Sequence, residues 1–481
     1  MKNILFAASE CVPFAKTGGL GDVVGTLPNY LPKDEFDARV ILPNYKKIDK
    51  KYKDQMTEAA SFPLQLGPAV KPCRILTLTN NGVQYYFVDN DDYFGSDEFY
   101  DGMPWDLGRF AFYSKAVLEC LQYIGFTPDI IHCNDWQSGL VPVYLDAFYK
   151  NIPDYSHIRT IMTIHNLKFQ GTWDIPSVMS VTGLPSDYFT MEAMEFHGNA
   201  NLLKGGLVYA DRISTVSETY ANEILMPFYG EGLDGLLTAH RDKLCGIVNG
   251  IDYLRYDPQN DPQIHTNYCA ADFRKKKPKN KAALQKELGL KVDPHILMIG
   301  LISRLTDQKG IDLIGCMADE LCNDNIQLVI LGNGDPRYEE MFKYMAAHNP
   351  EKVSASIMYD DALSHRIYSS VDAFLMPSQF EPCGLSQLMA MRYGTVPIVR
   401  ETGGLKDTVQ PYNEYEHNGT GFSFANFNAH EMMGTIRYAE RIYYYKKRDW
   451  NNIAQRAMEK DFSWDASVRK YEKLYNDLTE A

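Results

Sequence analysis

The chain has 481 residues, which is enough for two or three domains with large buried cores. Its 62 Asp and Glu against 48 Lys and Arg give a formal net charge of −14, and a surface of this sign repels nucleic-acid phosphates and anionic lipids. We therefore expect neither nucleic acid nor a membrane as a partner. An anionic ligand would need a local group of cations.

The cysteines and the N-terminus indicate a cytoplasmic protein. The nine cysteines are scattered and form no C-x-x-C motif, which favours free thiols in a reducing compartment. The apolar run at 4–8 is too short for the core of a signal peptide, and no run approaches the roughly 18 apolar residues of a membrane span. His132, Cys133, His157 and His165 lack the spacing of metal ligands, so we expect no metal.

In the first half of the chain, short apolar runs alternate with amphipathic segments. This pattern is typical of a parallel sheet with helices on both faces, and it predicts a doubly wound α/β domain over residues 1–246. In chain order we expect strand 4–8, helix 21–31, strand 39–42, extended segments 73–79 and 83–88, helix 107–124, strand 130–133, helix 139–148, and strands 160–164 and 212–216.

The second half repeats the pattern and predicts a second doubly wound domain over 247–460. It begins at a hinge near 245–250, and its first part, up to Lys281, is rich in Pro, Asn, Asp and Lys. The segment 461–481 contains a predicted helix at 463–478 that could pack back on the first domain. The expected elements are strand 296–302, helix 310–321, strand 327–331, helix 336–347, strand 356–359, helix 363–370, strand 373–376, helix 385–393 and strand 396–400.

Ligands of doubly wound sheets bind outside the carboxyl ends of the strands, so the motifs there matter most. After the first strand, the glycine pair in Lys16–Val23 permits close backbone approach and opens a helix whose N–H groups suit an anion, with Lys16 as a cation. These glycines lie about ten residues past the strand end, which disfavours a nicotinamide dinucleotide site and hence an oxidoreductase. An ordinary turn with a solvated lysine is the alternative.

After strand 296–302, Arg304 and Lys309 lie five residues apart in a strand-to-helix loop. A planar guanidinium and a point charge together could clamp a leaving diphosphate without a metal. The alternative is a solvated loop with a surface ion pair to Asp307.

After strand 373–376 comes a segment containing Glu381, Pro382 and Gly384, in which Pro382 suits the first helical position. Glu381 is either a helix cap or a group that accepts a sugar hydroxyl or stabilises positive charge on a reacting ring. The next strand ends in a second glycine pair at 403–404, which also suits phosphate.

Two strand ends of the first half carry His165 and the Asp135-Trp136 pair. A lone histidine is more often structural than catalytic, but its place at a strand end favours a ligand contact. An acceptor beside an aromatic ring suits carbohydrate, whereas plain core packing is the alternative for Trp136.

Taken in order, these motifs resemble the bacterial glycogen synthase and plant starch synthase family over nearly the whole chain. The matching segments are Lys16–Leu20, Asp135–Trp136, His165–Leu167, Val248–Asp252, Ser303–Leu305 with Lys309–Gly310, Glu381–Leu385 and Thr402–Leu405. The resemblance implies a GT-B fold, in which two Rossmann-like domains face a central cleft. It further implies retaining transfer of glucose from ADP-glucose to the non-reducing end of an α-1,4-glucan, with release of ADP and without a cofactor.

The resemblance also implies site residues. Arg304 and Lys309 resemble the diphosphate clamp, Glu381 would contact the transferred glucose, and His165 and Asp135 would line the glucose side. The implied catalytic residues are Lys309, Arg304, Glu381 and His165. The implied substrate-binding residues are Lys16, Thr17, Gly18, Gly19, Asp22, Tyr93, Asp135, Trp136, Asn166, Asn249, Tyr359, Cys383, Gly384, Leu385 and Ser386.

Two rival functions stay open at this point. One is a retaining glucosyltransferase of the same fold that uses UDP-glucose or another acceptor. The other is a glucan-binding protein without catalytic activity.

Overall fold

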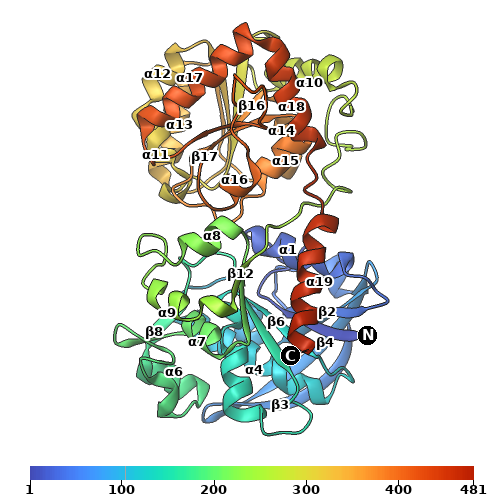
Figure 1. Cartoon of the computed structure of the whole chain (residues 1–481). Coiled ribbons are helices and arrows are strands. Elements are labelled where there is room, and N and C mark those ends of the chain that lie inside the picture. Colours follow the sequence, from blue (N-terminus) through green and yellow to red (C-terminus); the bar gives the residue numbers. More distant parts are fainter. Residues whose placement is uncertain (103, 481) are drawn as a thin grey trace. The chain divides into compact units, whose positions relative to one another are not determined.

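The computed structural model describes residues 1–102 and 104–480, and the chain divides into two compact units. Unit 1 comprises Met1–Val216, Ala221–Ile247 and the C-terminal helix α19 (Trp464–Glu480), as Figure 1 shows by colour. Unit 2 comprises Ser217–Tyr220 and Val248–Ser463. None of the helices in the described residues combines the length and the apolar character that crossing a membrane requires.

Unit 1 is built on a nine-stranded sheet in the order β12-β11-β7-β6-β1-β2-β5-β4-β3. Every neighbouring pair from β12 to β5 is parallel, whereas β4 is antiparallel to both β5 and β3. The strands are β1 (Lys2–Ala7), β2 (Phe36–Pro43), β3 (Thr57–Leu66), β4 (Ala69–Asn80), β5 (Val83–Asp89), β6 (Ile130–Asn134), β7 (Arg159–Ile164), β11 (Arg212–Thr215) and β12 (Leu244–Gly246).

The chain of unit 1 also forms a small antiparallel sheet of β8 (Thr172–Asp174), β10 (Asn199–Asn201) and β9 (Glu195–Phe196), which the sequence did not predict. Strands of two or three residues are too short for an alternating pattern to be recognised. The helices within Met1–Ile247 are α1 (Gly19–Tyr30), α2 (Lys50–Lys53), α3 (Asp91–Phe94), α4 (Trp105–Glu119), α5 (Leu140–Tyr144), α6 (Ile175–Thr182), α7 (Leu202–Tyr209), α8 (Glu218–Glu223) and α9 (Asp234–Ala239).

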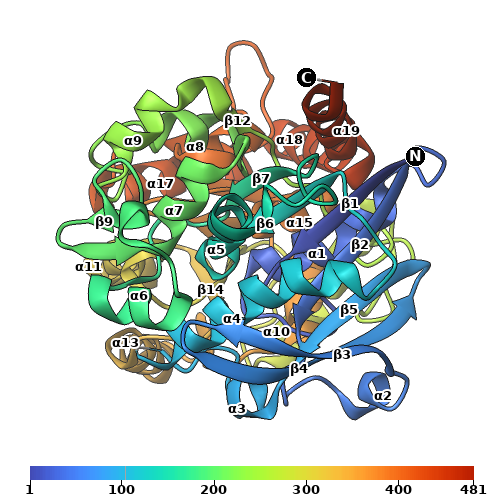
Figure 2. The same ribbon diagram turned by 90° about the horizontal axis from the view of Figure 1, so that it is seen from below.

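Helix α19 packs on unit 1 beside the N-terminal strand. The Tyr475 hydroxyl lies 2.8 Å from His132 Nδ1, and the Phe6 ring meets the Tyr475 ring edge-on at 6.4 Å. Figures 1 and 2 both place the N-terminus next to α19, and Lys2 Nζ lies 3.9 Å from Glu480 Oε1. The two ends of the chain are thus parts of one unit.

Unit 2 contains a six-stranded sheet, all parallel, in the order β15-β14-β13-β16-β17-β18. With the sheet of unit 1, it confirms the predicted α/β class with two doubly wound sheets. Its strands are β13 (Leu297–Ile302), β14 (Ile326–Leu331), β15 (Val353–Ser356), β16 (Ala373–Met376), β17 (Val396–Arg400) and β18 (Phe422–Phe424). Its helices are α10 (Phe273–Glu287), α11 (Ile311–Cys316), α12 (Ala318–Asn323), α13 (Pro336–His348), α14 (Asp361–Ser370), α15 (Ser386–Arg392), α16 (Gly403–Thr408), α17 (Ala429–Tyr445) and α18 (Lys447–Glu459).

Three predictions for unit 2 are wrong in their boundaries. The strand expected at 356–359 lies at β15, because this half-exposed edge strand is polar and the apolar run that follows it is solvent-exposed. The helix expected at 310–321 breaks at Met317, which leaves the helical conformation and is buried in the core. Pro382 is not the first residue of a helix, since α15 begins four residues later.

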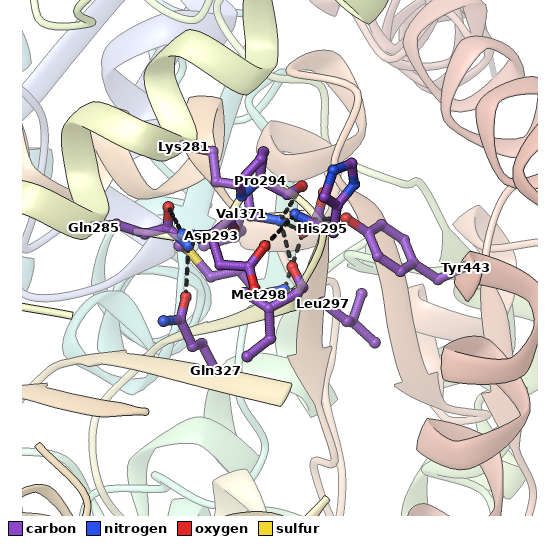
Figure 3. Close-up of polar contacts among 12 residues, drawn as sticks. Lys281, Gln285, Asp293, Pro294, His295, Leu297, Met298, Gln327, Val371 and Tyr443 are labelled. Carbon is purple, nitrogen blue, oxygen red and sulfur yellow. Dashed lines mark hydrogen bonds and ion pairs between the residues drawn. The ribbon is translucent and has the colours of Figure 1, made fainter. Parts of the chain in front are cut away.

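Helix α10 overlaps the end of the polar region that reaches Lys281, for which the sequence predicted no helix. It buries Lys277, Asn280, Lys281 and Gln285 beside only two apolar side chains, Phe273 and Leu284, so hydrophobic periodicity could not reveal it. Lys281 Nζ pairs with Asp372 Oδ2 at 2.7 Å, and Gln285 Nε2 donates to Gln327 Oε1 at 2.7 Å. Figure 3 shows Lys281 near Pro294 and Gln285 near Asp293, whose backbone oxygens accept from them at 3.3 Å and 2.9 Å. The buried polar groups are tolerated because they find partners.

Candidate active site

In unit 2, two loops that follow strand ends bring together a cation and a carboxylate. Lys309 follows β13, Glu381 follows β16, and Lys309 Nζ lies 2.6 Å from Glu381 Oε2. Ser378 Oγ donates to the same oxygen at 3.0 Å. The two ionic side chains are only 17% and 8% exposed, so water screens their attraction weakly.

The interactions of Glu381 rule out the cap interpretation. The residue before α15 is Leu385, and no side chain caps that helix. The carboxylate of Glu381 binds Lys309 and Ser378 instead, through Oε2. Its other oxygen, Oε1, accepts none of the hydrogen bonds found among the described residues that involve Glu381.

A third loop, after β17, holds the Glu381 loop in place. The N–H of Gly404 donates to Glu381 O at 3.2 Å and to Pro382 O at 3.1 Å. A Cβ atom at Gly404 would lie 1.9 Å from Cys383 O, and one at Gly403, where φ is +44°, would lie 2.0 Å from Glu381 O. Only glycines allow this approach. The glycine pair that the sequence assigned to phosphate therefore has a packing role here.

Arg304 shares the β13–α11 loop with Lys309 but is exposed to solvent and forms none of the ion pairs found in the described part of the chain. The alternative was a solvated loop with an ion pair to Asp307, and the exposure of Arg304 fits the solvated loop, but the ion pair found at Asp307 is with a different residue. Asp307 pairs with Arg337 at 2.5 Å. The guanidinium of Arg304 is thus available to a ligand, while Lys309 is held by Glu381.

Asn249 and Cys383, both predicted to bind substrate, contact each other. Both are buried, and the polar groups of Asn249 partly oppose the effect of burial on the pKa of the thiol. Burial raises the pKa of Cys383 to about 12, so the thiol is uncharged at neutral pH. Asn249 Oδ1 is buried and accepts no hydrogen bond within residues 1–102 and 104–480.

The remaining predicted residues of unit 2 are less tightly placed. Gly384 has φ +70°, and its carbonyl accepts from Gln387 Nε2 at 2.9 Å. Leu385 and Ser386 are half-buried at the start of α15. Tyr359 is 74% exposed beyond β15 and is not in contact with the Lys309–Glu381 pair in any interaction found.

In unit 1, the loop Lys16–Gly19 is held by a residue that the sequence analysis missed. Glu10 accepts hydrogen bonds from Thr17 N at 2.5 Å, from Gly18 N at 3.0 Å and from the Tyr100 hydroxyl at 2.6 Å. These two amides are therefore not free for an anion, as the glycine motif had suggested. Glu10 lies nine residues before α1, and its burial, which the sequence does not show, is what brings it to this loop.

The cation of this loop is also engaged. Lys16 Nζ pairs with Asp22 Oδ1 at 2.8 Å, and both side chains are partly exposed. Asp22 lies in the first turn of α1, where an acidic side chain interacts favourably with the helix dipole. Lys16, Thr17, Gly18, Gly19 and Asp22 thus form one linked loop and helix start.

A second group of unit 1 lies at the ends of β6 and β7. Asp135 Oδ1 accepts from the backbone N–H of His165 at 2.7 Å, and His165 Nε2 lies 2.9 Å from Asn134 Oδ1. Burial raises the pKa of Asp135 to about 7 and lowers the pKa of His165 to about 3. The imidazole is therefore neutral, and Asp135 titrates near neutrality.

The backbone of Asp135 is strained, with φ +55° and ψ −178°. A residue other than glycine in this region costs about 1–3 kcal/mol, and such strain concentrates at functional sites. Asn166, next to His165, turns inward to its own loop, because its Oδ1 accepts from Lys168 N at 3.1 Å.

Two aromatic residues of the prediction are packed against other rings. Trp136 is 9% exposed and lies 5.0 Å from the Phe110 ring and 5.5 Å from the Trp173 ring. This packing favours the core interpretation of Trp136 over a stacking platform for sugar. Tyr93 stacks on Phe112 at 4.6 Å and is half-buried.

No metal centre is found in the described part of the chain, where His, Cys, Asp and Glu side chains do not gather in groups of three or more that could hold an ion.

Two family models match the chain. Residues 3–239 match the starch synthase catalytic domain, and residues 280–457 match glycosyl transferases group 1. A glycogen synthase of Lachnospira eligens is 57% identical over 478 residues, covering 99% of this chain and 100% of the relative. One of Lachnoclostridium phytofermentans is 57% identical over 479 residues, with the same coverage.

Solved structures agree with these matches. The catalytic domain of starch synthase IV from Arabidopsis thaliana, bound to ADP and acarbose, has a TM-score of 0.91 and 32% identity, covering 100% of this chain and 99% of the other. A sucrose-phosphate synthase from Thermosynechococcus elongatus, with a TM-score of 0.63 and 17% identity, shares the fold. The GT-B fold class predicted from the sequence is confirmed.

Proposed function

We propose that this chain, which belongs to the glycogen synthase and starch synthase family of glycosyltransferases, transfers glucose from ADP-glucose to the non-reducing end of an α-1,4-glucan and releases ADP. The structural observation that carries the proposal is the Lys309–Glu381 pair, on which strand-end loops of unit 2 converge. It supplies a cation for a leaving phosphate beside a carboxylate for a sugar.

In this reaction the bond between the anomeric carbon and the diphosphate oxygen breaks. A bond from the anomeric carbon to an acceptor hydroxyl oxygen forms, and the hydroxyl proton passes to a phosphate oxygen. Negative charge develops on the diphosphate, and Lys309 and Arg304 stabilise it. Fixed cations of this kind accelerate a reaction because they act most strongly on the charge of the transition state.

Lys309 can bind Glu381 and a phosphate oxygen at the same time. Its ammonium has three N–H donors, and Glu381 takes one of them at 2.6 Å, which leaves donors for phosphate. Arg304 offers a planar fork to two oxygens. No metal or cofactor is needed for this charge stabilisation.

Glu381 has a complementary role at the sugar. Lys309 and Ser378 hold Oε2, so Oε1 can accept a hydroxyl of the transferred glucose or face the positive charge that develops on the ring. Pairing with an ammonium makes this carboxylate a weak nucleophile. We therefore favour retention of configuration by attack on the same face as the departing diphosphate, over a double displacement through Glu381.

In unit 1, we assign Lys16 to the donor, with Glu10 holding the loop that carries it, and His165 and Asp135 to sugar hydroxyls. A neutral imidazole and a carboxylate suit uncharged polyols. We also assign the protein to the cytoplasm, with no nucleic acid or membrane as partner, because its cysteines are free and its net charge is −14.

The test is the release of ADP and of UDP from the two nucleotide-glucoses, with and without glycogen, in the presence of a chelator. ADP release that depends on glycogen and persists with the chelator supports the proposal. Faster release of UDP would show that UDP-glucose is the preferred donor instead of ADP-glucose. Glycogen binding without turnover of either donor would favour the silent glucan-binding protein.

A further inference from the structure

Asn134, which ends β6, is anchored through all its polar groups. Its Nδ2 donates to Ala7 O at 3.2 Å and to His132 O at 3.0 Å. Its backbone N–H donates to Ser138 Oγ at 2.6 Å. The side chain is buried, at 1% exposed. A buried amide with this many partners has one stable orientation.

The orientation of the side-chain amide determines which of its two polar atoms, Oδ1 or Nδ2, faces His165. Turning the amide over would point Oδ1 at the two carbonyl oxygens and leave no donor for them. The acceptor Oδ1 therefore faces His165 Nε2, at 2.9 Å. Because a carbonyl oxygen only accepts, the proton of the imidazole must be on Nε2.

We propose that Asn134 is a positioning residue that fixes His165 as the Nε2–H tautomer, so that Nδ1 presents a lone pair to the substrate. The identity of the substrate in this inference rests on the proposed function, whereas the tautomer of His165 does not. The neutral state of the ring at working pH follows from its burial, which lowers the pKa to about 3.

The backbone of His165 is fixed as well. Its backbone N–H donates to Asp135 Oδ1 at 2.7 Å, so Asp135 holds the backbone while Asn134 holds the ring. No hydrogen bond to Nδ1 is found among the described residues, and the side chain is not fully buried. Nδ1 can therefore accept from a ligand.

This arrangement limits what His165 can do. A lone pair accepts a hydrogen bond from a sugar hydroxyl but repels phosphate oxygens, which have no proton at neutral pH. His165 is therefore a selector for a hydroxyl and neither a general acid nor a phosphate ligand. Asn134 sets which ring nitrogen of His165 carries the proton, and the position of this proton determines which ligand groups His165 can bind.

The tautomer can be read directly in the wild-type protein. With 15N-labelled histidine, the cross-peak pattern between each ring nitrogen and the ring carbons' protons identifies the protonated nitrogen. His165→Gln, which removes one signal, assigns the resonance. We expect the proton on Nε2 from pH 6 to 8, and a proton on Nδ1 would overturn the proposal. This reading needs no activity, so it stands apart from the donor test.

The functional role is tested by a double-mutant cycle of Asn134→Ala and His165→Ala. We expect Asn134→Ala alone to lower kcat/KM about tenfold, as the loss of one substrate hydrogen bond does, and to have little further effect when His165 is already alanine. The affinity for ADP should stay within about twofold of the wild type. Equal losses in both backgrounds, or no loss in either, would overturn the positioning role.

Asn44→Ala is the matched control. Asn44 follows β2 of the same sheet, and its Nδ2 donates to Asp89 Oδ1 at 2.7 Å. The substitution removes a similar side-chain amide, and none of the hydrogen bonds found for Asn44 involves His165, so we expect kcat/KM to be unchanged. If the wild type turned over neither donor, the proposed function would fail while the labelled histidine still decided the tautomer.

Discussion

Lys309 and Glu381 are 72 residues apart in the sequence, yet their side chains form a 2.6 Å ion pair with little exposure to water. Removing two charges from water is costly, so such a pair is weak evidence for stability. The pair instead keeps an ammonium and a carboxylate at fixed positions before any ligand arrives. Such preorganisation is what charge stabilisation in a transition state requires.

Lys309→Ala should reduce kcat by about 10²-fold or more, by analogy with the loss of other transition-state donors. Initial rates of ADP release with saturating glycogen provide the measurement. Lys343→Ala is the control, because Lys343 pairs with Glu340 on the exposed face of α13 and should leave the rate unchanged. An unchanged kcat in Lys309→Ala would remove this residue from the diphosphate clamp.

Glu381→Gln should abolish most turnover while the protein folds normally. Since Glu381 caps no helix, its loss leaves α15 intact, and Gln retains a group that can bind Ser378. Turnover and far-UV circular dichroism should be measured on the same preparation. Kinetics like those of the wild type, with a loss of about 1 kcal/mol in unfolding free energy, would restore the cap interpretation.

Gly404→Ala should lower both stability and turnover. The new Cβ would overlap Cys383 O at 1.9 Å, and relief of the overlap must shift the loop that carries Glu381. We expect about 1–3 kcal/mol of destabilisation, measured by denaturant unfolding, together with a reduced kcat. In α17, Gly434 has open space around its Cβ position, so Gly434→Ala should stabilise by up to about 1 kcal/mol. A fully active Gly404→Ala would contradict the role of this loop contact.

Asp135→Asn should change how stability depends on pH. Burial raises the pKa of Asp135 to about 7 in the folded protein, above its value of 3.8 when unfolded. The folded state therefore holds a proton that the unfolded state has lost, and this residue's contribution to stability falls as pH rises from about 4 to about 7.

Asp135→Asn removes the ionisable carboxyl group and with it this pH-dependent contribution to stability. We expect the unfolding free energy of Asp135→Asn, relative to the wild type, to increase across this pH window in chemical denaturation. A constant difference between the two proteins from pH 4 to 7 would show that Asp135 is not protonated preferentially in the folded state.

The sequence predicted the site best where strands end. The strands before Arg304, Glu381, Asp135 and His165 are short, mostly buried runs rich in apolar or β-branched residues, and their carboxyl ends locate the loops. Because those loops follow directly from strand boundaries, the candidate residues could be named without a structure.

What the sequence could not predict are contacts between distant loops. The Lys309–Glu381 pair, the hold of Glu10 on Thr17, and the packing of Gly404 on Cys383 join segments that no local pattern links. Helix α10 was missed for a related reason, since most of the side chains that it buries are polar and their partners lie in other elements.

The most direct test of the account is chain elongation with a labelled acceptor. A maltooligosaccharide carrying a fluorophore at its reducing end is incubated with ADP-glucose, and products and ADP are counted together. We expect a ladder of products, each longer by one glucose unit, with one ADP released for each added unit. An exo-acting enzyme specific for α-1,4 bonds should remove the added units. ADP release without lengthening of the acceptor, or no reaction at all, would contradict it.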